Sequence, residues 1–464
     1  MINIKYVDFC SGIGGFRYAI DAYQKTKDNI EFTCVLSADI KKDAIQTYNL
    51  NFNENNPSRD IYQIKPKEME SFDLICAGFP CQPFSSAGQK KGFEDPRGGM
   101  IFKIVDICEY HKPRYVLLEN VHNLISLNNG EYINSICKLF GDLGYKVKYT
   151  KLNSKNFGIP QSRERVYIIC TLDKDVNISG VENMSNTVTL KQFLDYTYTK
   201  SDLNDEFVEK LLKLHKKTSI CGCKIGDKRG GKDNIHSWDL AINGTVSEDE
   251  RNLMTSIMLN RRKKHWAAKK QITWMDGMPL TFSEIQTFFK HDDLQSLLDS
   301  LTEKNYLRLE QCKELIDGRR VYIDDLVPEC EQIVSNIKKQ LDESSTDALK
   351  QKLIEAEGNL VRVRLLCKSD TATRGYNICK GKLSFPVSRI LNPDEICPTL
   401  TATDSNRLAV VIGNTVRKLN HLELKRVCGF PETLKLPNDV NVYDLFGNMA
   451  TPPVLYKLIE LMFD

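Results

Sequence analysis

The chain has 464 residues, a net charge of +3 and a hydrophobic content of 41%. This length predicts two or three domains with a sizeable core. The net charge is too small to identify a binding partner by itself. Fifteen irregularly spaced cysteines, with no apolar segment ahead of the first strand, favour a reduced, cytoplasmic protein over a secreted one. No apolar run approaches the roughly 20 residues of a membrane span.

The first part of the chain alternates short apolar strands with amphipathic helices. Strands are predicted at 5–9, 32–37, 73–78, 115–119, 146–152 and 166–171. The first helix carries apolar residues at helical spacing, namely Phe16, Ala19, Ile20 and Tyr23. This alternation is typical of an α/β fold with a parallel, doubly wound sheet, whose ligand crevice lies at the C-terminal ends of the strands.

A glycine-rich turn, DFCSGIGGF, joins the first strand to the first helix. Glycines allow the backbone to approach a ligand, but the G-x-G-G spacing departs from the G-x-G-x-x-G of dinucleotide sites. Asp39 ends the second strand, where a carboxylate can bind ribose hydroxyls, and Asp60 could accept from an adenine amino group. Each aspartate alone could be a surface cap. The ordered set predicts an adenosine-bearing cofactor.

The stretch GFPCQPFSSAG places one thiol, Cys81, between two prolines. Proline fixes φ and donates no backbone hydrogen bond, so Pro80 and Pro83 indicate that a strand ends here. The thiol is therefore expected on a stiff loop at the sheet rim. Glu119 follows three apolar residues, and because a carboxylate is costly inside a core, it is expected at the same rim.

Two arginines, Arg163 and Arg165, stand two positions apart where another strand begins, so they share a face. In a crevice they could neutralise a phosphate, or hold a base oxygen while raising the thiolate fraction of a nearby cysteine. A surface ion-pair ladder with Glu164 is the alternative. The lone Cys221-Gly-Cys223 motif has no matching second pair, so ordinary thiols are favoured over zinc and no metal is expected.

From about 190 to 395 the alternation is lost. The segment 261–270 has six positive charges and no acid, which favours phosphate contact over a solvated helix. Two helical patterns at 281–289 and 294–301, followed by a hairpin of 306–309 with 320–323, predict a winged helix. Residues 327–357 read as a long solvated helix or hairpin. After 396 the α/β pattern returns.

Five motifs occur in this order: DFCSGIGGF, GFPCQPFSSAGQKKGFEDPRG, ENV, QSRER and GNMATPP. With them, residues 4–170 and 396–464 resemble the DNA (cytosine-5) methyltransferases of restriction–modification systems. The resemblance implies a Rossmann-like S-adenosylmethionine-dependent methyltransferase fold with a variable, mixed α+β target recognition domain. The implied segments are a catalytic and cofactor-binding part (1–190), the target recognition domain (191–395, winged-helix-like at about 270–326) and a return to the catalytic domain (396–464).

The resemblance also implies a reaction: the enzyme flips a cytosine out of a specific short sequence in double-stranded DNA and methylates its C5, protecting the site from a partner restriction endonuclease. A monomer is expected. Cys81 would attack C6 of the base, and Glu119 would hold N3 and the exocyclic amine. Arg165 would reach the O2 side, and Arg163 would order the loop and phosphate contacts. The residues implied to bind the cofactor are Phe9, Gly12, Gly14, Gly15, Asp39, Ile40, Asp60, Ile61, Pro80 and Asn448. Those implied to bind DNA are Gln82, Ser85, Gln161, Arg261, Arg262, Lys263, Lys264 and, at a base edge, Arg374.

Two positions depart from the family pattern: Asp39 stands where glutamate is usual, and Met449-Ala450-Thr451 follows Gly-Asn in place of a small residue and valine. Three alternatives are weaker. The tRNA-methylating branch carries a Cys-Phe-Thr signature that is absent here. A catalytically silent DNA-binding protein would not need Cys81, Glu119 and Arg165 together. Amino-methylating enzymes would show an Asn/Asp-Pro-Pro-Tyr type tetrapeptide.

Overall fold

The computed structural model describes residues 2–80, 99–181, 185, 188–227, 231, 233–269, 278–311, 314–316, 319–321, 323–343, 346–368, 374–379 and 385–464. The chain divides into two compact units, Met1–Leu203 with Ile390–Asp464, and Asn204–Arg389. The first unit thus runs past the expected boundary at 190 and resumes before 396. No helix among the described residues is long and apolar enough to cross a membrane.

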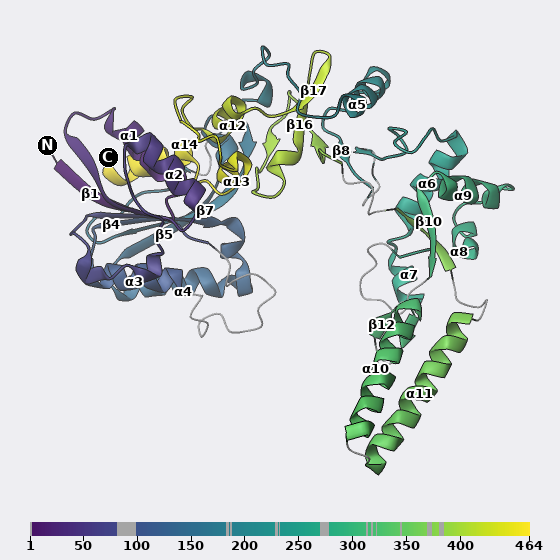
Figure 1. Cartoon of the computed structure of the whole chain (residues 1–464). Coiled ribbons are helices and arrows are strands. Elements are labelled where there is room, and N and C mark those ends of the chain that lie inside the picture. Colours follow the sequence, from purple (N-terminus) through teal and green to yellow (C-terminus); the bar gives the residue numbers. More distant parts are fainter. Residues whose placement is uncertain are drawn as a thin grey trace. The chain divides into compact units, whose positions relative to one another are not determined.

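The first unit is built on a sheet of strand order β2-β1-β3-β4-β7-β5 (Figure 1). Its strands are β1 (Ile2–Phe9), β2 (Ile30–Ala38), β3 (Leu74–Gly78), β4 (Tyr115–Val121), β5 (Lys146–Asn153) and β7 (Glu164–Thr171). All six predicted strands are confirmed. The expectation that the sheet is parallel throughout is wrong, because β7 runs antiparallel to both neighbours. The chain between β5 and β7 contains no crossover helix, and a parallel connection needs one or a comparable length of chain.

Helices cover both faces of this sheet, because successive strand residues point to opposite sides. Tyr6 belongs to a core shared with α1 (Gly15–Gln24) and α14 (Pro452–Phe463). Val7 belongs to the opposite core, shared with α3 (Met100–His111) and α4 (Glu131–Asp142). Figure 1 shows these two layers on either side of the strands. A further helix, α2 (Lys42–Phe52), follows β2.

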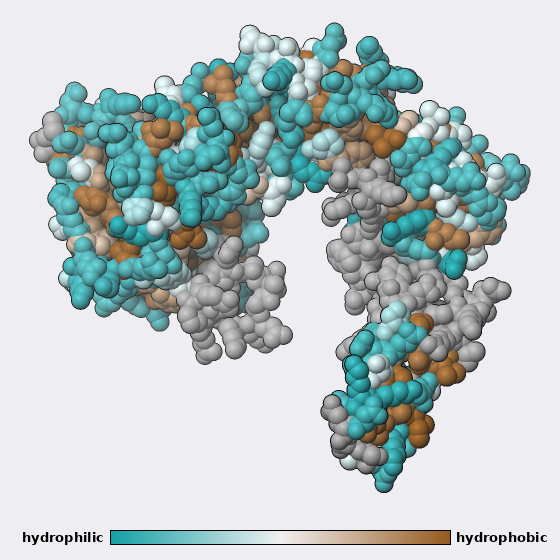
Figure 2. All heavy atoms as spheres, viewed as in Figure 1, coloured by the Kyte–Doolittle hydropathy of each residue, from teal (hydrophilic) through white to brown (hydrophobic). Residues whose placement is uncertain are grey.

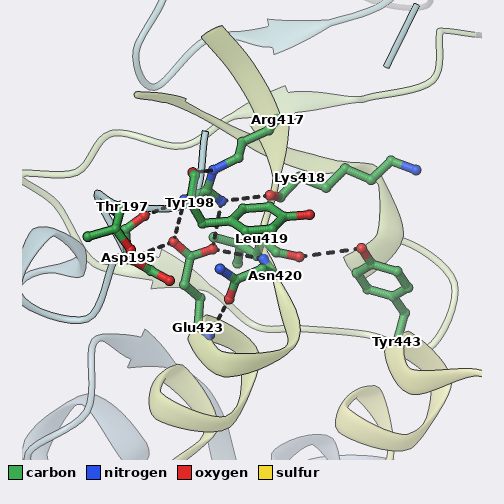
Figure 3. Close-up of polar contacts among 9 residues, drawn as sticks. All are labelled: Asp195, Thr197, Tyr198, Arg417, Lys418, Leu419, Asn420, Glu423 and Tyr443. Carbon is green, nitrogen blue, oxygen red and sulfur yellow. Dashed lines mark hydrogen bonds and ion pairs between the residues drawn. The ribbon is translucent and has the colours of Figure 1, made fainter. Parts of the chain in front are cut away.

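The C-terminal part of this unit adds β15 (Cys397–Pro398), which pairs with β6 (Gln161–Ser162), a hairpin of β16 (Leu408–Ile412) and β17 (Thr415–Lys418), and the helices α12 (His421–Cys428), α13 (Val442–Gly447) and α14. Arg417 of β17 and Glu423 of α12 form a fully buried ion pair (Figure 3). Arg417 also donates to the carbonyl oxygens of Asp195 and Tyr198. These bonds attach residues 195–198 to the hairpin, which explains why this segment belongs to the first unit.

The second unit contains α5 (Asp205–Lys217), β8 (Lys224–Ile225), β9 (Asn234–Ile235), α6 (Glu248–Asn260), α7 (Lys264–Lys269), α8 (Phe282–Gln286), α9 (Leu294–Glu303), β10 (Leu307–Gln311), β11 (Glu314–Ile316), β12 (Arg319–Val321), α10 (Ile323–Glu343), α11 (Asp347–Lys368) and β13 (Arg374–Ile378); β14 (Arg389–Ile390) stands at the boundary. Two helices do form near 281–289 and 294–301. The predicted hairpin is wrong, because β10 pairs with β13 and β12 pairs with β11.

The charged segment after β12 forms a helical hairpin, α10 with α11 (Figure 1). Val334 and Leu360 are buried in it. Other apolar side chains of the hairpin, Ile333, Ile354 and Val361, are exposed, and Figure 2 shows hydrophobic residues on its surface. Of the two sequence readings, a long helix or a hairpin, the hairpin is the one observed.

Candidate active site

A cavity of about 470 Å³ lies in the first unit, among residues at the C-terminal ends of β1 to β4. Its volume is within the usual range for small-molecule sites. Ten residues predicted from the sequence line it: Gly12, Asp39, Ile40, Asp60, Ile61, Pro80, Glu119, Arg163, Arg165 and Asn448. The tertiary structure therefore brings together most of the residues singled out for cofactor and base.

The glycines of the first turn have different roles. Gly12 has φ +53°, and a Cβ there would meet no atom within 4 Å, so the backbone is open to the cavity. A Cβ on Gly14 would lie 2.4 Å from the ring of Phe52, and one on Gly15 would lie 2.3 Å from the carbonyl oxygen of Ala450. Gly14 and Gly15 are thus required for packing, and neither they nor the buried Phe9 line the cavity.

Two aspartates that line the cavity are held by backbone amides. The Asp39 carboxylate accepts from Gly12 N at 2.9 Å and from Lys41 N at 2.8 Å, while the Asp60 carboxylate accepts from Tyr62 N at 3.0 Å. Each carboxylate oxygen has more than one lone pair, so both groups can accept further hydrogen bonds from a ligand. Ribose hydroxyls and an adenine amino group are donors of this kind, and the residues present therefore fit an adenosine-bearing cofactor.

Glu119 and Arg165, which also line the cavity, form an ion pair, with Arg165 Nε 3.1 Å from Glu119 Oε1. The two side chains are 11% and 14% exposed. Burial raises the pKa of Glu119, against the opposing effects of Arg165 and Arg163. A carboxyl group that keeps its proton can donate one hydrogen bond and accept another. The pair can thus recognise a planar polar ring.

Arg163 does not reach toward a phosphate. It is 3% exposed, and its guanidinium donates to the carbonyl oxygens of Leu400, Gly447 and Met449 at 2.7–3.2 Å. Burial lowers the pKa of Arg163 to about 10. The predicted phosphate contact is wrong for this residue. It holds together the loops around the cavity, because buried carbonyl oxygens need donors.

Gln161 requires a similar correction. Its side chain is fully buried, donates to Val427 O at 3.2 Å and accepts from Leu400 N at 3.3 Å. Because both the donor and the acceptor of this amide are hydrogen-bonded inside the core, the Gln161 side chain does not contact DNA. The DNA contact that the resemblance implied for Gln161 is therefore wrong, although a glutamine is more often exposed than buried.

Cys81, Gln82 and Ser85 lie outside the described residues. The chain that leads to Cys81 is held at Phe79, whose carbonyl oxygen accepts from Asn120 Nδ2 at 2.9 Å. Asn120 follows Glu119 in β4, so one strand carries the buried Glu119 carboxyl group and anchors the segment before Cys81. Lys41, Arg59, Tyr62 and Asp444 are among the cavity-lining residues missed from the sequence, because no local pattern marks them.

In the second unit the predicted basic cluster is divided. Arg261 is 1% exposed, with Nη2 3.4 Å from the carbonyl oxygen of Asp227, so the prediction that it contacts phosphate is wrong. Lys263 and Lys264 are exposed and Arg262 is half-buried. Arg374 begins β13 and is exposed.

Comparison with known proteins decides the family. The model of the C-5 cytosine-specific DNA methylases matches residues 4–464. The chain belongs to this family. It is 35% identical over 469 residues to the Type II methyltransferase M.NlaIV of Neisseria lactamica, covering 99% of each chain. It is also 33% identical to the Type II methyltransferase M.BanI of Aneurinibacillus aneurinilyticus, covering 100% of this methylase and 96% of that protein.

The fold of the methylase is also found among solved structures. The crystal structure of the S. pombe Dnmt2 methyltransferase matches with a TM-score of 0.50 at 16% identity, over 99% of this chain and 98% of that one. The expected methyltransferase fold is confirmed. The enzyme is a DNA cytosine-5 methyltransferase.

Proposed function

We propose that this methylase modifies C5 of one cytosine within a specific short sequence of duplex DNA, with the base flipped into the cavity and Cys81 as nucleophile. The observation that carries the proposal is the Glu119–Arg165 pair, which lies on the same cavity as Asp39 and Asp60. The lining thus offers groups that suit a polar ring and groups that suit an adenosine.

The chemical difficulty is that C5 of cytosine is a poor nucleophile. In the proposed reaction the Cys81 thiolate forms a bond to C6, which makes C5 enamine-like. Glu119 donates its proton toward N3 and accepts from the exocyclic amine, while Arg165 faces the O2 side. After C5 has been methylated, loss of its proton and of the Cys81–C6 bond restores the ring.

S-adenosylmethionine, when bound, supplies the methyl group as an electrophile. Asp39 would hold the ribose hydroxyls, Asp60 the adenine amino group, and Ile40 the adenine face. Gly12 leaves space for close approach of the backbone. Asn448 would complete the pocket from the C-terminal segment.

The named relatives are Type II methyltransferases, which supports a role as the modification enzyme of a restriction–modification system. We infer that it acts as a monomer on its site and protects that site from a cognate endonuclease. Sequencing the 5-methylcytosine positions in DNA of cells that express the chain would identify the recognition sequence.

Glu119→Gln should lower turnover by roughly 100-fold or more, the usual contribution of an acid–base group. Glutamine keeps the shape but cannot donate a carboxylic proton to N3. Affinity for S-adenosylhomocysteine should hardly change, because in the proposed reaction Glu119 contacts the base and not the cofactor. Steady-state methylation of duplex DNA and calorimetric titration of S-adenosylhomocysteine measure the two effects separately.

Glu164→Gln is the matched control, since the Glu164 carboxylate forms an exposed ion pair with Lys151 at 3.5 Å. It should methylate like the wild type. Loss of S-adenosylhomocysteine binding in Glu119→Gln, with turnover per bound enzyme preserved, would contradict the assigned role.

Replacing Arg262, Lys263 and Lys264 by alanine should weaken all duplexes alike if these residues contact phosphates. The slope of log affinity against log salt should fall by up to about 0.9 for each lost contact.

Replacing Arg374 by alanine should instead cost roughly 1–3 kcal/mol of binding free energy at the correct site and reduce discrimination between DNA sequences. Salt titrations with cognate and scrambled duplexes separate the two effects. An unchanged salt slope after replacement of Arg262, Lys263 and Lys264 would mean that these residues form a solvated face and do not contact phosphates.

A further inference from the structure

The proposed cofactor cavity is lined on one side by the N-terminal segment of the first unit and on another by its C-terminal segment. Asp39 and Lys41 follow β2, whereas Asp444 and Asn448 belong to α13 and its C-cap. Some 400 residues of sequence separate the two walls, so something must hold them at a fixed spacing if one ligand is to contact both.

A series of polar contacts joins α2 and the residue before it to the segment 435–444, named here the strap. Asn51 exchanges two hydrogen bonds with the backbone of Lys435, at 2.7 and 2.8 Å. Further along, the strap bonds to Gln46 through Asp439 at 3.1 Å and to Asp43 through Asn441 N at 3.2 Å. The contacts advance along the strap as they recede along α2, so the two segments run antiparallel.

The last contact of the series lies on the cavity. Lys41 Nζ donates to Asp444 Oδ2 at 2.8 Å. The other oxygen, Asp444 Oδ1, accepts from Asn448 Nδ2 at 3.0 Å, and Asp444 O accepts from the same nitrogen at 2.9 Å. The amide nitrogen of Asn448 is thereby committed to Asp444, and its side-chain oxygen is the group left to accept from a ligand.

Lys41 also holds its own side of the cavity, because its backbone N–H donates to Asp39 Oδ1 at 2.8 Å. One residue therefore orients the ribose-facing carboxylate through its backbone and Asn448 through its side chain and Asp444. This arrangement couples the two walls.

We propose that Lys41 and Asp444 are positioning residues of the cofactor site, whose ion pair fastens the strap so that Asp39 and Asn448 face one ligand. The inference rests on the proposed cofactor site. Neither residue reacts, and the pair acts by pre-organising the groups that bind.

The test uses the full-length enzyme and calorimetric titration of S-adenosylhomocysteine. Lys41→Met should raise the dissociation constant about three- to fivefold, the upper range for a partly exposed pair. Asp444→Asn should have a larger effect, since it also weakens the hold on Asn448. The double variant should bind no more weakly than Asp444→Asn, because the two residues act through one contact.

The matched control is Lys42→Met, which removes the same charge one residue away, outside the cavity lining. It should bind like the wild type, and Lys41→Arg should retain most of the affinity. The KM for the cofactor should rise in Lys41→Met while kcat stays near the wild-type value. In 1 M salt the difference between wild type and Lys41→Met should shrink, because an exposed pair is screened.

Equal dissociation constants for Lys41→Met and Lys42→Met would overturn the inference, provided that Asp39→Ala weakens binding. If Asp39→Ala binds like the wild type, the cofactor site itself is wrongly placed. Thermal unfolding of each variant identifies a general loss of structure. If Lys41→Met unfolds at a lower temperature than the wild type and also loses DNA binding, Lys41 has a merely structural role, which would contradict the proposal.

Discussion

Cys81→Ser is expected to abolish methyl transfer while leaving binding of S-adenosylhomocysteine and duplex DNA nearly intact. An alcohol is a far weaker nucleophile than a thiolate at neutral pH, so attack on C6 should fail although the side chain is nearly isosteric. Transfer of a labelled methyl group to cognate duplex DNA measures the loss. Near-normal turnover of the serine variant would contradict the covalent mechanism.

The covalent step can be tested without relying on a rate. Duplex DNA with 5-fluorocytosine at the target should trap a covalent adduct with the wild-type enzyme, since elimination cannot remove fluorine. Denaturing electrophoresis detects the adduct. Cys81→Ala should form none, and an adduct that persists in this variant would show that another residue is the nucleophile.

Glu423→Gln is expected to destabilise the first unit by about 3–5 kcal/mol, the usual cost of breaking a buried ion pair from one side. Arg417 and Glu423 are fully buried, and two hydrogen bonds of 2.7 and 2.8 Å join them. The remaining donors of Arg417 go to the carbonyl oxygens of Asp195, Tyr198 and Lys418, as Figure 3 illustrates. Removing the carboxylate charge leaves the guanidinium buried without its counter-charge.

Urea denaturation of the full chain measures this loss as a lower midpoint. The same helix supplies a matched control, because Arg426 pairs with Glu432 at the surface, where the glutamate is 59% exposed. Glu432→Gln should cost no more than about 1 kcal/mol. Similar midpoints for Glu423→Gln and Glu432→Gln would mean that the buried pair contributes little beyond an exposed one.

The sequence by itself determined the strands of the central sheet and the order of the motifs along it. Short-range patterns suffice for this: apolar runs mark buried strands, and a residue such as Asp39 or Glu119 that follows such a run lies at the sheet edge. Parallel strands end at a common edge, so these residues met in one cavity as expected. The direction of β7 was not predictable from its composition, because an apolar strand has the same pattern in either orientation.

Only the tertiary structure decided which polar side chains are buried and which distant residues meet. Arg261 and Lys263 belong to one basic run, yet Arg261 is buried near the backbone of Asp227 and Lys263 is exposed. Lys41 and Asp444 contact each other across most of the chain length. Burial and pairing depend on what packs around a side chain, and neighbours in space are not encoded by neighbours in sequence.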